Sequence, residues 1–229
     1  MKKALLFLSV LFITMSYGQE MKQIPQITVN GEGKVKVIPD QVTIAVTVET
    51  KGNNAKDVKK QNDEKIEAVL KFIKKMNLAP ADYKTQRVSL NPQYDYEKKK
   101  HSYNATQTIE ILLKDLSKYD ELMEGLVDEG INRIDAVTFQ SSKLVQHQSE
   151  ARKLAMKEAK LKAEDYVSVL GQKVGRAITI SDTSQTHYPQ PMYAAMKTME
   201  MSDTNAPRET LAIGEINITA TVSVSFILE

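Results

Sequence analysis

Residues 216–228 have the sequence INITATVSVSFIL, and this stretch decides the fold class. Apolar residues occupy every second position from Ile216 to Leu228, and Asn, Thr and Ser side chains fill most positions between them. Because successive side chains of a strand point to opposite faces, the pattern predicts a long strand with one buried and one polar face. The Thr/Ser face can be solvated or can pack against another subunit. Residues 42–49 show the same alternation and predict a second half-buried strand.

Other extended segments flank these two strands. Residues 27–37 form a strand pattern interrupted by Gly31 and Gly33, which indicate a bulge or the close approach of another backbone. Two runs with period-two patterns, 88–96 and 103–113, predict a hairpin with the charged residues 97–100 at its tip. Shorter strands are predicted over 134–139 and 174–180.

Helical spacing appears in two segments before residue 130. The first follows Asn53 and Asn54, which can cap it, and its apolar residues keep three- and four-residue spacing up to Met76. The second is predicted over residues 117–129, with Gly130 after its last turn. Single helices therefore separate pairs of strands.

The longest predicted helix spans residues 144–170 and is followed by Gly171. One stripe of this helix consists of alanines at every fourth position, namely Ala151, Ala155, Ala159 and Ala163. Such a stripe has almost no side-chain bulk, so we expect the backbone of a neighbouring element to approach it closely.

This order of elements predicts an α+β fold of two small two-layer α/β sandwich modules with antiparallel sheets. We expect the middle module, strand–strand–helix–strand over residues 85–140, to be inserted into an outer, discontinuous module. The outer module is predicted to comprise residues 24–84 and 141–229 and to contain a Met/Pro-rich loop at 185–208.

The first 18 residues have the pattern of a secretory signal peptide. Lys2 and Lys3 precede an apolar run from Ala4 to Met15, which is too short to span a bilayer, and small residues precede Gln19. Cleavage is therefore expected between Gly18 and Gln19, and the mature chain is predicted to be periplasmic or secreted, without a spanning segment. The alternative, an uncleaved membrane anchor, has weaker support from these flanking residues.

The composition excludes several classes of function. The chain has no cysteine, which excludes disulfide scaffolds, thiolate metal sites and cysteine nucleophiles. Lys2 and Lys3 account for the whole formal charge of +2, so the mature chain is formally neutral. Acidic residues are interleaved with the lysines, which indicates solvated faces, and no nucleic-acid partner is predicted. Neutrality also leaves little long-range repulsion to oppose self-association.

No catalytic or cofactor-binding residue can be proposed from spacing, because the sequence lacks the usual nucleophile, phosphate-binding and zinc-helix motifs. The residues that could bind a soft metal or undergo oxidation are clustered in one loop: His187, Met192, Met196, Met199 and Met201. Methionines also pack adaptably, so the same loop could instead form a subunit contact or a flap. Their spacing matches no fixed ligand geometry and favours packing, so no metal is predicted.

Several stretches together resemble the SIMPL-domain family, which includes bacterial periplasmic immunogenic antigens and proteins of oxidative-stress defence. The resemblance rests on the order of these segments: residues 27–33, 85–96, 103–116, 139–142, 151–171, 191–196 and 214–216. One departure is Ser102, where the family pattern has glycine. The resemblance implies two α+β modules, export, homo-oligomers in some members and no known catalytic site.

We therefore expect an exported, non-enzymatic protein that self-assembles in the periplasm and supports the cell envelope or oxidative-stress defence. The alternative is a metal- or small-ligand-binding module that uses the Met/His/Tyr-rich loop. A homo-oligomer and an association with the envelope are the expected partners.

Overall fold

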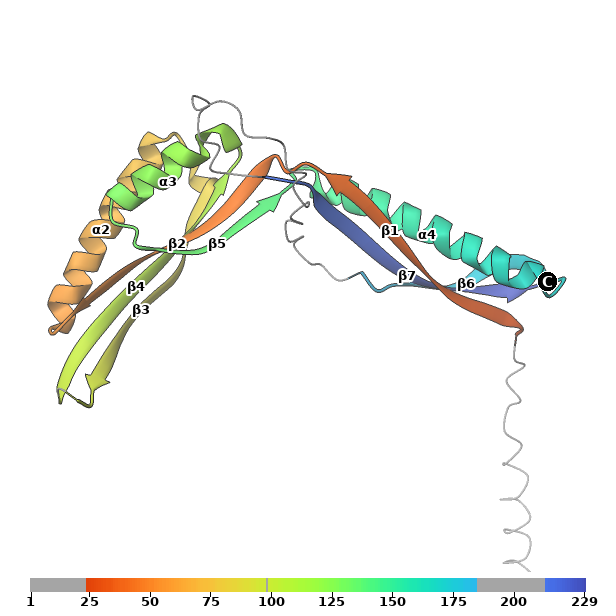
Figure 1. Ribbon diagram of the computed structural model, residues 1–229, viewed down its shortest axis with the longest axis horizontal. Coiled ribbons are helices and arrows are strands. Elements are labelled where there is room, and N and C mark those ends of the chain that lie inside the picture. The colour runs from red at the N-terminus through yellow and green to blue at the C-terminus, as the bar shows by residue number, and fades with distance from the viewer. Residues whose placement is uncertain (1–23, 98, 185–212) are drawn as a thin grey trace, which may run out of the picture.

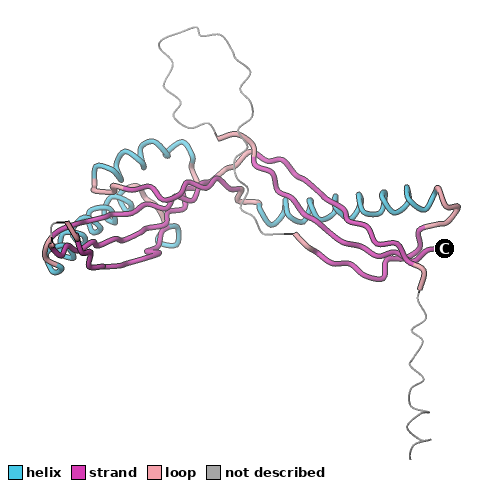
Figure 2. The backbone as a smooth tube through the Cα atoms, turned by 60° about the horizontal axis from the view of Figure 1, so that its bottom comes forward, coloured by secondary structure: helices cyan, strands magenta, loops and turns pink. Residues whose placement is uncertain are grey.

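The computed structural model describes residues 24–97, 99–184 and 213–229, which form two lobes placed end to end (Figure 1). Each lobe is a sheet with helical structure against one side, two described α-helices in the first lobe and one in the second, as Figure 2 shows. The seven described strands are β1 (Gln26–Val37), β2 (Gln41–Gly52), β3 (Tyr83–Asp95), β4 (Lys100–Leu113), β5 (Arg133–Gln140), β6 (Val174–Asp182) and β7 (Ile216–Leu228). The predicted α+β class with antiparallel two-layer sandwiches is confirmed.

Three α-helices belong to the described part of the chain: α2 (Ala55–Lys75), α3 (Tyr119–Asp128) and α4 (Leu144–Ser168). Short 3-10 turns, η2 (Pro80–Asp82) and η3 (Leu116–Lys118), precede β3 and α3. Among these described helices, none is both long and apolar enough to cross a bilayer.

The first lobe is built on a four-stranded antiparallel sheet with the order β3-β4-β2-β5. Alternate residues of the central strands point toward α2 and α3, and Val42, Ile44, Val46 and Val48 of β2 are fully buried there. They pack against apolar residues of both helices, such as Val69 and Leu126. The alternation that predicted β2 therefore also identifies the face that the helices cover.

Helix α2 begins where the sequence predicts. The Asn54 side chain accepts hydrogen bonds from the backbone N–H groups of Lys56 (2.9 Å) and Asp57 (3.3 Å), so two of the four free donors of the first turn are satisfied. Lysines on the outer face pair with carboxylates one turn away, as Lys59 does with Asp63.

The second lobe is built on a three-stranded antiparallel sheet with the order β1-β7-β6, which packs against α4. The alanine stripe of α4 is completely buried, as predicted. It contacts β1 at Gly31 and Gly33, where an added Cβ would lie 2.0 Å from the Ala155 carbonyl oxygen and 1.9 Å from that of Ala151. The register of β1 with β7 is continuous across both glycines, so they mark a close approach and not a bulge.

The assignment of residues 41–84 differs from the sequence-based division into modules. We expected β2 and α2 in the outer module, but β2 pairs with β4 and β5 in the centre of the four-stranded sheet, and α2 covers it. Of the described elements, β1, α4, β6 and β7 belong to the outer lobe. Alternation shows that a strand has one buried face, but it does not identify the strands that will pair with it.

Two chain connections between the lobes are bound to each other. Asp40 lies between β1 and β2, and its carboxylate accepts hydrogen bonds from the Ser142 backbone N–H (2.6 Å) and hydroxyl (2.5 Å). Ser142 precedes α4, so Asp40 fixes the start of this helix against the opposite connection. The Asp40 backbone N–H also donates to the Gln140 carbonyl (3.3 Å).

Candidate functional site

The open face of the four-stranded sheet, on the side away from α2 and α3, is the most polar organised surface of the first lobe. It carries the alternate residues of β2 that are not in the core, including Thr43, Thr47 and Glu49. Their direct partners on β4 are also polar or amphipathic, as in the pairs Thr47–Thr108 and Glu49–Thr106.

Thr47 lies at the centre of this face and is completely buried, although no helix covers it. Its hydroxyl is 2.6 Å from the Thr108 hydroxyl and donates to the Asp135 carboxylate. Asp135 reaches Thr47 because it is the extra residue of a β-bulge, where Ala45 pairs with Ala136 and Val46 pairs with Ile134. The bulge therefore places a carboxylate over the sheet.

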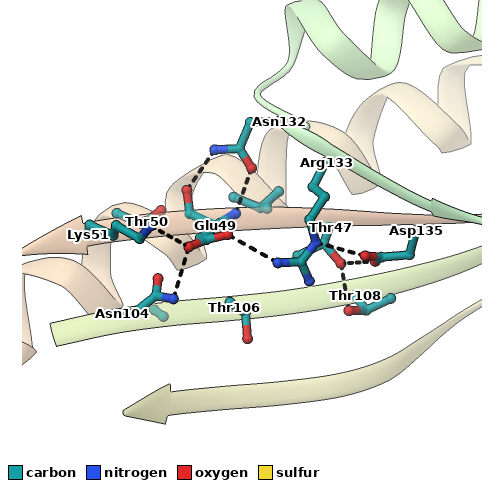
Figure 3. A network of polar contacts seen from close by, with 12 residues as sticks. Thr47, Glu49, Thr50, Lys51, Asn104, Thr106, Thr108, Asn132, Arg133 and Asp135 are labelled. Atoms are coloured by element: carbon teal, nitrogen blue, oxygen red, sulfur yellow. Dashed lines mark hydrogen bonds and ion pairs between the residues drawn. The ribbon is translucent and has the colours of Figure 1, made fainter. Parts of the chain in front are cut away.

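Glu49 is the second centre of the network (Figure 3). Its carboxylate accepts from Asn104 (3.0 Å), and it pairs with Lys51 (2.9 Å) and Arg133 (3.1 Å). Arg133 also donates to Asp135 (2.7 Å) and so joins the two centres. The network connects β2, β4 and β5 through side chains as well as through the sheet.

Asn132 attaches the start of β5 to this network. Its side-chain amide donates to the Glu49 carbonyl (2.7 Å) and accepts from the Glu49 backbone N–H (2.8 Å). The Asn132 side chain thus pairs with the backbone of Glu49 as a strand residue would, at the position just before β5 begins.

The two carboxyl groups of the network favour the ionised form. The hydrogen bond from Lys51 is the main cause that lowers the pKa of Glu49, and Asn104 and Arg133 lower it further. Burial alone would raise the pKa of Asp135, but the hydrogen bonds from Thr47 and Arg133 outweigh burial and lower this pKa. Both groups are therefore charged at neutral pH.

A groove of about 610 Å³ lies beside the network on the same open face. Ala45 and Ala136 line it, and these cross-strand partners leave space because their side chains are small. Three carboxylates also line the groove: Asp82, Glu110 and Asp135. Each has a basic partner: Lys114 is 2.6 Å from Asp82, Lys84 is 2.7 Å from Glu110, and Arg133 is 2.7 Å from Asp135.

Comparison with known proteins assigns a family to this arrangement of two sandwiches. The family model SIMPL, described as "Protein of unknown function (DUF541)", matches residues 27–226. The chain belongs to the SIMPL family. The predicted resemblance is therefore confirmed over both lobes, including the open face described above.

Curated relatives of this SIMPL chain include two groups of bacterial proteins. It is 28% identical over 183 residues to "Uncharacterized protein YggE" of Escherichia coli K12, covering 79% of this chain and 74% of the relative. It is 25% identical over 223 residues to the "26 kDa periplasmic immunogenic protein" of Brucella melitensis, covering 91% of this chain and 87% of the relative. Neither of these names describes an enzyme.

The metal and redox candidates from the sequence lie outside the described residues of this SIMPL protein. These are His187, Met192, Met196, Met199 and Met201, and their role stays a prediction. Within residues 24–97, 99–184 and 213–229, no three His, Asp or Glu side chains gather closely enough to hold a metal ion. The other two histidines are far apart in the sequence: His101 packs on Tyr94 in the β3–β4 hairpin, and His147 lies on α4.

The open face is suited to bind a partner through several hydrogen bonds. It is less suited to bind a ligand through one strong charge. Each groove carboxylate is paired with a cation, and the Thr47 hydroxyl is buried beneath Asp135 and so is not accessible to a reactant. A polar partner surface could exchange hydrogen bonds with the exposed groups. The alternation of residues 42–49 predicts a strand with one polar face, but it does not predict this network.

The network makes a pH-dependent contribution to stability that Asp135→Asn tests. A group whose pKa is lowered in the folded state stabilises the fold above its unfolded pKa, about 4, and this stabilisation is lost as the pH falls through the folded pKa. We expect the variant to be about 1–2 kcal/mol less stable than wild type at pH 7, with a smaller difference at pH 3. Urea unfolding at both pH values measures this difference.

Asp128→Asn is the matched control, because it makes the same charge change at the exposed end of α3. We expect this control to change stability by less than about 0.5 kcal/mol at pH 7. A stability loss in Asp135→Asn that stays the same at pH 3 would assign the effect to packing and not to the charge of Asp135.

Proposed function

We propose that this chain is an exported, non-enzymatic periplasmic protein that self-assembles and supports the cell envelope or oxidative-stress defence. Three findings support this proposal: membership of the SIMPL family, the periplasmic name of the Brucella relative and the signal-peptide pattern of residues 1–18. The alternative is a metal-binding module that uses the Met-rich loop, which lies outside the described residues.

The observation that carries the proposal is the exposed edge strand β6. Residues 177–181 of this strand have the sequence AITIS, are uncharged and are all exposed. Ile178 is 38% and Ile180 is 59% exposed, because α4 packs over β1 and β7 and barely contacts β6. An edge strand with an uncharged stretch of exposed β-branched residues is a template for pairing with another chain.

The opposite edge of the same sheet is blocked. On β1, the backbone N–H of Glu32 donates to the Glu158 carboxylate of α4, and Lys162 donates to the Asn30 carbonyl (3.1 Å). These side chains occupy backbone groups that an added strand would need. Within the described part of this lobe, β6 is therefore the edge that remains available.

The edges of the four-stranded sheet carry features that oppose pairing. The edge strand β3 contains Pro92, which has no N–H group to donate to an added strand. The edge strand β5 presents the charged residues Arg133 and Asp135. We infer that two copies pair through β6, which would extend the three-stranded sheet across the subunit boundary.

Light scattering of the purified mature chain tests this proposal. We expect an oligomer at micromolar concentration, and we expect Ile178→Lys/Ile180→Lys to lower the particle mass at least twofold, because paired edges would bring like charges together. Asn30→Lys adds a charge at the blocked edge and serves as the control, with an unchanged mass. A strictly monomeric wild-type chain would contradict self-assembly, and an unaffected double variant would contradict the assignment to β6.

A further inference from the structure

The β3–β4 hairpin extends beyond the rest of its sheet. The pairing of β2 with β4 stops at Gly52 and Tyr103, whereas β3 and β4 continue to pair as far as Asp95 and Lys100. The last part of the hairpin is therefore a two-stranded arm that projects from the first lobe (Figure 1). We call the exposed residues Tyr94, Tyr96, Lys99, Lys100 and His101 of this arm the hairpin tip.

Aromatic rings meet on the hairpin tip. The centroid of the Tyr94 ring lies 4.8 Å from that of His101, its direct cross-strand partner. It lies 5.0 Å from the centroid of the Tyr96 ring, which it meets edge to face. The contact between Tyr94 and His101 helps to stabilise the hairpin itself. Tyr96 is different, because it is 84% exposed and gains little from burial within the chain.

The turn beside these rings carries lysines, and Lys99 has a left-handed backbone conformation. The sequence places Lys98, Lys99 and Lys100 in a row, against the two carboxylates of Asp95 and Glu97. Lys99 has φ = 50°, in the left-handed region that glycine or asparagine adopts more readily than lysine. A lysine at this position is unfavourable for the turn, so the charge itself is the more natural reason for its presence.

We propose that the hairpin tip docks on the surface of a phospholipid bilayer that contains anionic headgroups. Tyrosine is suited to the bilayer interface because its ring is apolar and its hydroxyl remains hydrated. Lysines near the surface are attracted to anionic lipids by roughly 1 kcal/mol each. A projecting arm can reach a flat surface without interference from the rest of the lobe, whereas a ligand held in a groove needs a concave site. This inference goes beyond the proposed assembly and does not require it.

The test uses the full mature chain and vesicle flotation. One set of vesicles contains phosphatidylethanolamine and phosphatidylcholine only, and the other also contains phosphatidylglycerol. We expect binding to increase with the anionic lipid and to fall about thirtyfold in Lys99→Glu/Lys100→Glu, since two lysines at about 1 kcal/mol each correspond to that factor. Tyr96→Ser is expected to weaken binding to both sets of vesicles.

Lys153→Glu/Lys157→Glu is the matched control, because it makes the same charge change on the exposed face of α4. If this control lost binding as strongly as the tip variant, the net charge and not the hairpin tip would be responsible. Tyr96→Ser keeps the Tyr94–His101 contact, so thermal unfolding at the wild-type temperature would show that the hairpin remains intact.

Two other results would overturn the inference. The first is the absence of flotation with either vesicle set for the wild-type chain. The second is binding to a soluble polyanionic glycan with no binding to vesicles, which would assign the hairpin tip to a carbohydrate partner. The assembly variant Ile178→Lys/Ile180→Lys separates this test from the proposed function, because its tip is unchanged and its binding should still depend on phosphatidylglycerol.

Discussion

Replacing Gly33 with valine is expected to destabilise the three-stranded lobe by at least about 3 kcal/mol. This loss is larger than the loss that overpacking causes at an ordinary core position. At Gly33 even an added Cβ would lie 1.9 Å from the Ala151 carbonyl oxygen and 2.5 Å from the Ala155 backbone nitrogen. Both obstacles are backbone atoms, which no side-chain rotation can move. The helix would have to move away from β1 and lose the contacts of its alanine stripe.

Hydrogen exchange resolved by segment measures this effect, since a lobe that opens exchanges faster than one that stays closed. We expect faster exchange in β1, β7 and α4 and unchanged protection in β2 and β4. Lys34→Val is the control, because it places the same side chain on the exposed face of β1 next to Gly33. Ala151→Gly should not rescue the variant, because it removes a methyl group and leaves the obstructing carbonyl.

The same contact shows how far sequence patterns can predict this fold. The four-residue repeat of alanines predicts a helix that allows close approach, and the glycine pair predicts a strand that needs it. Each pattern implies a partner, and the structure shows that they are partners of each other. Spacing within a segment is a local property, so it can be recognised in the sequence without knowledge of the tertiary structure.

The assignment of β2 to a lobe could not be predicted in the same way. Residues 38–40 connect β1 to β2, and the change of sheet occurs within this short connection, which contains Pro39. Consecutive strands often pair, but here β1 pairs with β7 and β2 pairs with β4 and β5. Pairing across such long sequence separations depends on the whole chain.

The polar network was also beyond sequence-based prediction, for a specific reason. Asp135 reaches Thr47 only because of the β-bulge, and a bulge is not visible in the alternation of a strand as short as β5. The sequence does carry a signal for a different polar contact, on the helix side of the sheet: Asn62 stands four residues from both Val58 and Ile66, in the apolar stripe of α2. A polar residue in such a position indicates a buried hydrogen bond at that point of the sheet.

Asn62→Asp is the second variant with a large expected effect. Asn62 is only 3% exposed, and its amide nitrogen donates to the carbonyls of Val48 (3.1 Å) and Ala105 (3.4 Å) and to the Thr50 hydroxyl (3.3 Å). A carboxylate of the same shape would direct negative charge at both carbonyls, which cannot donate to it, and only the Thr50 hydroxyl could. We expect a loss of at least about 3 kcal/mol at pH 7, the range found when a buried charge lacks its partner.

The pH dependence of Asn62→Asp separates charge from shape. Burial beside carbonyls should raise the pKa of the new carboxyl in the folded state, so the folded state holds its proton to higher pH than the unfolded chain. The penalty therefore shrinks as the pH falls and is smallest below the unfolded pKa of about 4, where a neutral carboxyl can donate to a carbonyl. Asn62→Leu removes the hydrogen bonds without adding a titratable group, so its stability loss relative to wild type should be nearly the same at pH 4 and pH 7. Urea unfolding at these two pH values measures the losses. Equal losses for Asn62→Asp would contradict the prediction. They would mean that Asn62 acts through packing and that its hydrogen bonds to β2 and β4 do not hold α2 in place.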